Sequence, residues 1–161
     1  MTAVPGPDGH NPWANVGLDR EVAMSKADDY VKAVMSAPVI HVAPDATVAQ
    51  ALRTMIDRDI GSVVVAEGGS AVGVFTERDL TRRILDDSGL LDRKVREVMS
   101  SPVTTVGPDD EVVFVFRLMN EKGIRRLPVV QDHRLVGIVT ERDLLQWVDA
   151  VANESGNPDR P

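Results

Sequence analysis

The chain carries one pattern twice, at a fixed spacing. Val-Met-Ser-Ala-Pro-Val at 34–39 returns at 98–103, and Gly-Val-Phe-Thr-Glu-Arg-Asp-Leu at 73–80 returns at 137–144 with two conservative changes. The offset is 64 residues in both cases, since 98 − 34 and 137 − 73 are both 64. Residues 34–84 align on 98–148 without a gap, and 20 of these 51 positions are identical. A gapless repeat indicates two copies of one structural unit, and we expect the copies to pack on each other, bury a shared core and form paired clefts.

Bulk composition narrows the class of protein. A length of 161 residues allows one domain, or two small units that share a core. Aromatic residues make up only 4%, which predicts a core of aliphatic side chains. The formal charge of 18 − 25 = −7 argues against a general nucleic-acid or anionic-membrane binder. The absence of cysteine excludes disulfides, thiolate catalysis and a cysteine zinc site.

The ends of the chain differ from its middle. No apolar run approaches the roughly 18 residues of a membrane span, and the N-terminus lacks the basic and apolar regions of a secretory signal. We therefore expect a cytoplasmic protein. Residues 1–17, rich in proline and glycine, predict a disordered arm. The expected organisation is a flexible arm plus an N-terminal helix (18–35) over 1–33, a first repeat over 34–86, a linker over 87–97, a second repeat over 98–151 and a polar tail over 152–161.

Each repeat predicts strand, helix, strand, strand and helix, an α/β (α+β) pattern. The first copy predicts strands at 39–42, 62–66 and 71–76, helices at 47–58 and 77–85, and a hairpin turn at 67–70. The second predicts strands at 103–106, 127–130 and 135–140, helices at about 110–121 and 141–151, and a turn at 131–134. The charged stretch 86–97 predicts a loop that leads into a short helical turn.

The repeated Gly-x-x-Thr-Glu-Arg-Asp segment falls where a strand passes into a helix. Such a junction presents unpaired N–H groups and the positive end of the helix dipole, which suits a phosphate. Asp143 stands about one turn after Thr140, and its carboxylate could accept hydrogen bonds from a vicinal diol such as a ribose. Gly137 would let backbone or ligand approach closely. An alternative explains the same residues without a ligand, because Thr followed by Asp at the third helical position resembles a capping box.

Three motifs, in this order and spacing, resemble a tandem CBS-domain protein, also called a Bateman module. They are the Val-Met-Ser-x-Pro-Val start, Ile-Arg-Arg-Leu-Pro-Val-Val at 124–130 and the Gly-Ile-Val-Thr-Glu-Arg-Asp-Leu end, and the resemblance covers about 34–150. It implies two pseudo-symmetric β-α-β-β-α repeats packed sheet to sheet. It also implies clefts for an adenosine ligand such as AMP, ADP, ATP, S-adenosylmethionine or NAD, a regulatory role and a homodimer.

The resemblance further implies that each cleft is built from both copies. Cleft one would take the following residues: Thr76, Arg78, Asp79, Val103, Thr104, Thr105, Ile124, Arg125 and Arg126. Cleft two would take these: Thr140, Arg142, Asp143, Val39, Ile40, His41, Ile60, Gly61 and Ser62. The arginines at 125 and 126 match positions that meet phosphate in relatives, whereas their counterparts at 61 and 62 carry no charge. We therefore expect cleft one to prefer an anionic nucleotide. The alternative for the two arginines is a solvated strand end.

The remaining residues predict neither a metal site nor a catalytic site. Three scattered histidines without cysteine do not make a metal site, and His41 is expected to be a polar pocket wall or a surface residue. No nucleophile–base set, P-loop or dinucleotide fingerprint is present, so we expect no enzyme and no required cofactor.

Two functions follow as hypotheses. The first is a stand-alone regulatory module that binds an adenosine ligand between its repeats and signals to an unidentified partner protein. The alternative is a ligand-independent structural or protein-interaction module with vestigial clefts. A nucleic-acid-binding regulator is disfavoured by the net charge of −7.

Overall fold

The computed structural model describes residues 29–155. The first copy holds β1 (His41–Val42), α2 (Val48–Arg58), β2 (Ser62–Glu67), β3 (Ser70–Thr76) and α3 (Glu77–Thr81), preceded by α1 (Val31–Val34). The second holds α4 (Val112–Lys122), β4 (Arg126–Gln131), β5 (Arg134–Thr140) and α5 (Glu141–Ser155). Two 3₁₀ turns, Leu90–Asp92 and Val95–Glu97, lie between the copies. The expected arm, most of the expected helix over 18–35 and the end of the tail lie outside the described residues.

Local sequence signals explain where the central elements begin and turn. Thr47 caps α2 in a capping box: its hydroxyl accepts a hydrogen bond from the Gln50 N–H, and the Gln50 side chain accepts one from the Thr47 N–H. The first hairpin turns through Gly68 and Gly69, both with positive φ, which glycine adopts without steric cost. The predicted helix over 47–58 and the predicted hairpin at 67–70 are confirmed.

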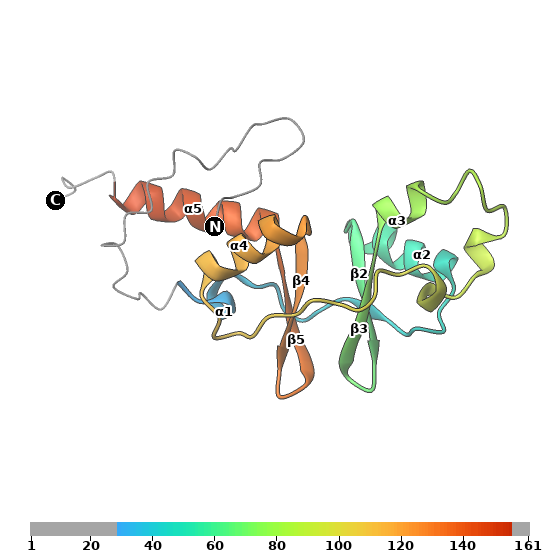
Figure 1. Cartoon of the computed structure of the whole chain (residues 1–161), viewed down its shortest axis with the longest axis horizontal. Coiled ribbons are helices and arrows are strands. Elements are labelled where there is room, and N and C mark those ends of the chain that lie inside the picture. The colour runs from blue at the N-terminus through green and yellow to red at the C-terminus, as the bar shows by residue number, and fades with distance from the viewer. Residues whose placement is uncertain (1–28, 156–161) are drawn as a thin grey trace.

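Two β-hairpins form the centre of the molecule, with helices outside them (Figure 1). β2 pairs antiparallel with β3, β1 adds to β2 in parallel, and β4 pairs antiparallel with β5. The hairpins lie against each other: β3 contacts both β4 and β5, and the Leu135 N–H donates to the Gly69 carbonyl at 2.8 Å. The mixed α+β class and the sheet-to-sheet arrangement of two pseudo-symmetric repeats are confirmed.

The expectation of one shared core is wrong, because each hairpin has a hydrophobic cluster of its own beneath its helices. One cluster holds Val48, Ala51, Met55, Val63, Val65, Phe75, Leu90, Val95 and Val98. The other holds Val31, Val106, Val112, Val115, Met119, Leu127, Val129, Val139 and Leu144. Successive strand residues face opposite sides, so Val64 and Val74, buried but in neither cluster, lie on the face of β2 and β3 turned toward the other hairpin.

The two copies exchange their first residues. Val31, just before the first repeat, is fully buried in the cluster of the second copy. Val95, its counterpart 64 residues later and just before the second repeat, is fully buried in the cluster of the first copy. Backbone hydrogen bonds follow the same exchange. Ser36 and Ile138 bond in both directions at 2.8 and 3.0 Å, and Ser100 and Val74 do so at 2.9 and 3.2 Å. Each spatial unit therefore depends on a segment that the sequence assigns to the other repeat.

The predicted strand over 103–106 is wrong except at its last residue, where Val106 forms an isolated bridge to Val129. In the first copy, the Val64 N–H donates to the Ile40 carbonyl at 3.4 Å beside β1. Pro128 stands at the position equivalent to Val64 and has no N–H to donate. The parallel ladder therefore stops at Val106, which bonds to the carbonyl of Pro128 and the N–H of Val130. The predicted strand over 39–42 is likewise shorter, at His41–Val42.

The last helix of each copy also differs from its expected length. α3 ends at Thr81, before the expected 85, and α5 continues to Ser155, beyond the expected 151. In α5, Trp147, Val148 and Val151 continue the inward face that starts at Leu144. After α3 the chain is in turns, and Leu85 there is 92% exposed. None of the helices within 29–155 is long and apolar enough to cross a membrane.

Candidate functional site

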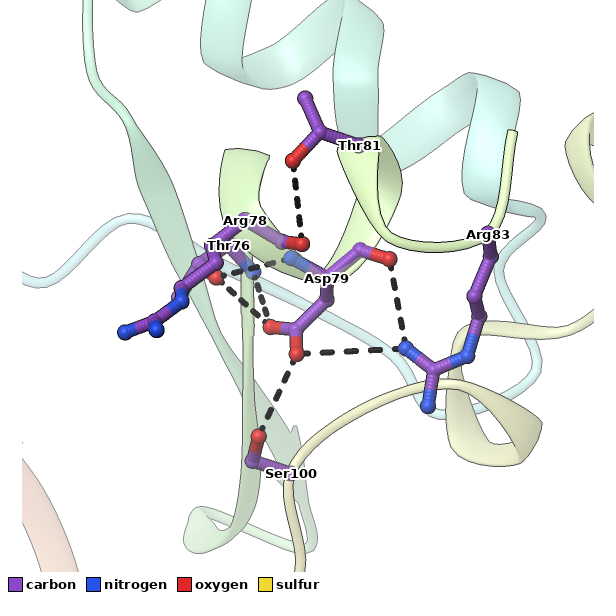
Figure 2. Close-up of polar contacts among 6 residues, drawn as sticks. All are labelled: Thr76, Arg78, Asp79, Thr81, Arg83 and Ser100. Atoms are coloured by element: carbon purple, nitrogen blue, oxygen red, sulfur yellow. Dashed lines mark hydrogen bonds and ion pairs between the residues drawn. The ribbon is translucent and has the colours of Figure 1, made fainter. Parts of the chain in front are cut away.

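A hydroxyl and a carboxylate meet at the junction of β3 and α3 (Figure 2). Asp79 Oδ2 accepts from the Thr76 hydroxyl at 2.7 Å and from the Thr76 N–H at 2.9 Å. The Asp79 N–H in turn lies 3.3 Å from Thr76 Oγ1. These contacts are a capping box, so the capping interpretation of the repeated motif is confirmed for the first copy. Capping uses Oδ2 of the carboxylate and leaves Oδ1 outside the helix turn.

The junction of β5 and α5 repeats this geometry. Asp143 Oδ2 accepts from the Thr140 hydroxyl at 2.6 Å and from the Thr140 N–H at 2.8 Å, and the Asp143 N–H lies 3.4 Å from Thr140 Oγ1. Both pairs are half-buried. The module thus presents two equivalent hydroxyl–carboxylate pairs, each at the end of a strand that faces the other repeat.

The second carboxylate oxygen has different surroundings in the two copies. Asp79 Oδ1 lies 3.5 Å from the Ser100 hydroxyl and 4.0 Å from Arg83 Nη1, which also donates to the Asp79 carbonyl at 3.2 Å (Figure 2). Trp147 replaces Arg83 at the equivalent position, since 147 − 83 = 64. Its indole nitrogen is buried and has no hydrogen-bond partner in the described part of the chain. Asp143 therefore lacks the arginine that approaches Asp79.

The chain just before and at the start of β1, at residues 38–41, borders a cavity of about 220 Å³. The cavity is lined by Pro38, Val39, His41, Ala66, Gly69, Leu135 and Val136. Val39 and His41 were expected in cleft two, whereas Thr140, Arg142 and Asp143 do not line this cavity and belong to the other end of β5. The remaining lining residues were not expected. They meet because the two hairpin tips bond to each other, and this long-range contact leaves no local sequence signal.

Arg125 and Arg126 point to different surroundings. Arg125 Nε lies 3.5 Å from Glu141 Oε2, and the Arg125 side chain is 77% exposed. Arg126 is half-buried and crosses to the first copy: a Cβ built on Gly61 would lie 3.1 Å from Arg126 Nη2 and 3.1 Å from Glu77 Oε2. The structure therefore brings Arg126 beside a residue that the sequence assigned to the other cleft.

The other expected site residues flank these groups. Ile40, Ile60, Val103, Thr104 and Ile124 are half-buried, Ser62 is buried, and Arg78, Arg142, Thr105 and His41 are exposed. His41 Nδ1 lies 3.2 Å from the Val39 carbonyl. Gly73 and Gly137 are each approached by a methionine, Met99 and Met35, so protein and not ligand occupies the space that these glycines leave. Within 29–155 no three histidine or carboxylate side chains gather as metal ligands.

Known proteins share this sequence pattern and this fold. The family model for the CBS domain matches residues 31–86 and 95–150. YhcV, a CBS domain-containing protein of Bacillus subtilis, is 34% identical over 125 residues, which cover 78% of this chain and 88% of that protein. The uncharacterized protein MK0525 of Methanopyrus kandleri is 42% identical over 111 residues, and the match spans only 57% of its length.

A solved structure agrees with both findings. The CBS domain pair of protein MJ0100, in complex with 5′-methylthioadenosine and S-adenosyl-L-methionine, superposes with a TM-score of 0.70 and 27% identity. The superposition covers 76% of this chain and 97% of that one. The chain therefore belongs to the CBS-domain family and contains two CBS domains in tandem.

Proposed function

We propose that this CBS pair is a regulatory module that binds an adenosine nucleotide or a related adenosyl ligand between its repeats and signals to a partner protein. The observation that carries this proposal is the paired Thr–Asp site, in which capping occupies Oδ2 and leaves Oδ1 of Asp79 and Asp143 outside the cap. A carboxylate oxygen in that position suits the two hydroxyls of a ribose. Candidate ligands are AMP, ADP, ATP, S-adenosylmethionine and NAD.

The surroundings of the pairs support an adenosine compound. Segments of the opposite copy flank each Thr–Asp pair, as the contact between Ser100 and Asp79 illustrates. The MJ0100 pair, with the same fold, is in complex with two adenosyl compounds. Binding residues would be those expected for clefts one and two.

Signalling requires that the ligand favours one arrangement of the module over another. A ligand held by both copies would stiffen their contact or change the angle between the hairpins, which a partner protein could sense. We include in the proposal a homodimer, a regulatory and not a catalytic role, and a cytoplasmic location.

The second candidate is an interaction module that needs no ligand. One observation favours it: both Thr–Asp pairs are already satisfied as helix caps, so their presence is explained without a nucleotide. In that case the exposed surface, and not the clefts, would carry the function.

Thermal unfolding of the full chain with millimolar AMP, ADP, ATP, NAD, S-adenosylmethionine and, as a control base, GTP separates the two. A ligand at 100 times its dissociation constant stabilises the folded state by about 2.7 kcal/mol, which raises Tm by several degrees. We expect a selective rise with an adenosine compound that is reduced in Asp79→Asn or Asp143→Asn, which keep a side-chain oxygen for the cap. A flat panel would overturn the sensor proposal and favour the interaction module.

A further inference from the structure

We propose that Arg83 is a specificity-determining residue: together with Ser100 it closes cleft one to a ribose, so that the module binds its adenosine ligand in cleft two. This inference rests on the adenosine-binding function proposed above and concerns which of the two Thr–Asp pairs is open to a diol. It reverses the preference for cleft one that the arginines at 125 and 126 predict by residue type.

In cleft one, the carboxylate oxygen that a diol needs is already in contact with protein. Asp79 Oδ2 caps α3, which leaves Oδ1 for a ligand. Arg83 Nη1 lies 4.0 Å from this oxygen, within ion-pair distance, and the Ser100 hydroxyl lies 3.5 Å from it (Figure 2). The Asp79 side chain is only 12% exposed. A ribose would therefore have to displace a cation and a hydroxyl group from a carboxylate that is largely buried.

Further contacts hold both of these groups in place. Arg83 Nη1 also donates to the Asp79 carbonyl at 3.2 Å, so a second interaction keeps the guanidinium group at α3. Ser100 and Val74 exchange backbone hydrogen bonds at 2.9 and 3.2 Å, which fix the serine beside β3. Arg83 reaches this position because α3 ends at Thr81 and the chain then turns.

Cleft two has the same Thr–Asp pair without these contacts. The counterpart of Arg83 is Trp147, which carries no charge and packs against the hydrophobic cluster of the second copy. The counterpart of Ser100 is Ser36, and its hydroxyl forms no hydrogen bond with Asp143 in the described part of the chain. Asp143 Oδ2 accepts the two bonds of the cap, and no group within 29–155 is bonded to Oδ1. Among the described residues, the oxygen that suits a diol is therefore open in cleft two and covered in cleft one.

Calorimetric titration of the full chain counts the ligands bound per chain, with AMP and S-adenosylmethionine as probes of opposite net charge. We expect one tight binding event for the wild type, and a second of similar strength in the double variant Arg83→Ala, Ser100→Ala. The contacts should weaken cleft one by about tenfold or more, the scale of one hydrogen bond to a charged group. Arg82→Ala makes the same charge change at an exposed neighbour and should keep the single event.

Substitution of the two aspartates assigns each event to a cleft. Asp143→Asn should remove the wild-type event, and in the double variant it should leave the added event. Asp79→Asn in the double variant should remove the added event alone. Asparagine keeps a side-chain oxygen for the cap, and thermal unfolding without ligand shows that each variant is folded.

Three results overturn the inference. The first is a wild-type event that survives Asp143→Asn and is lost in Asp79→Asn, which would place the ligand in cleft one. The second is two events of similar strength in the wild type, and the third is a single event in the folded double variant. In each case adenosine compounds still bind, so the proposed function survives. If no compound of the thermal panel binds either the wild type or the double variant, the function and the inference fail together.

Discussion

At the scale of single residues, the repeated threonine has a structural role that is separable from ligand binding. Thr140 Oγ1 accepts from the Asp143 N–H and donates to its carboxylate, so Thr140→Val, which keeps the side-chain shape, should lower the free energy of unfolding by about 1 kcal/mol. Urea denaturation without ligand measures this. Thr54→Val is the control, since the Thr54 hydroxyl donates to the Gln50 carbonyl one turn earlier in α2 and caps no helix. An equal loss in both variants would show that the cap contributes nothing special.

Gly73 leaves the space that the Met99 side chain occupies. Met99 packs so close to it that an added Cβ would collide with the Met99 sulfur and lie 2.9 Å from its Cγ. Gly73→Ala should therefore destabilise the fold by about 1–3 kcal/mol through overpacking. Met99→Ala in the same chain should recover part of this loss, because it removes the colliding atoms. Gly89→Ala, where the nearest atom lies at 3.6 Å, should be nearly neutral. Additive effects of Gly73→Ala and Met99→Ala would rule out the collision.

At the scale of elements, the sequence correctly predicted those helices and turns that are determined by interactions between residues close together in the chain. The capping box of α2 and the glycines of the first hairpin are short-range signals, and both elements lie where the sequence places them. The strand expected over 103–106 failed because Pro128, distant in sequence, withholds the N–H that a longer ladder would need. The sequence identified the residues of the Thr–Asp pairs. It did not predict that Arg83 and Ser100 approach Asp79, because these contacts depend on the path of the chain after α3.

The 3₁₀ turn Val95–Glu97 packs on the first copy, and ion pairs whose strength depends on pH hold it there. Asp45 Oδ1 and Oδ2 each lie 2.8 Å from a nitrogen of Lys94 and Arg96, and the hydrogen bond from Lys94 is the main cause that holds the pKa of Asp45 below 3.8. A carboxyl group with a lowered pKa in the folded state adds stability above its unfolded pKa, and this is lost as pH falls through the folded value.

Asp45→Asn should therefore be less stable than the wild type at pH 7, by a small amount because the pair is solvent-exposed. The difference should shrink as pH falls below 3.8, through the lowered pKa of Asp45. Urea denaturation of both chains at a series of pH values checks this. Asp57→Asn makes the same charge change on α2, where no ion pair of residue 57 is seen within 29–155. A difference between wild type and Asp45→Asn that persists unchanged at the lowest pH would show that the ion pairs do not stabilise the fold.

At the scale of the whole molecule, the repeat in the sequence and the unit in space are not the same. The gapless alignment correctly predicted two similar units, and the resemblance to tandem CBS domains implied their sheet-to-sheet packing. It did not reveal that Val31 packs in the core of the second copy and Val95 in the core of the first. The two residues are of the same type, so each core has the same composition whether or not they are exchanged. Val31 and Val95 are equivalent and both are fully buried, so each core is filled identically by either route.

The exchange predicts which fragment of the chain can fold by itself. A fragment of residues 31–86 follows the sequence repeat but lacks Leu90, Val95 and Val98, all buried in the first cluster. A fragment of 38–102 contains every buried member of that cluster. Removing three buried aliphatic side chains costs several kcal/mol, of the order of the whole stability of so small a unit. We expect cooperative thermal unfolding by circular dichroism for 38–102 and none for 31–86. Cooperative unfolding of 31–86 alone would mean that the first core forms without the returning segment, and that the exchange contributes little to folding.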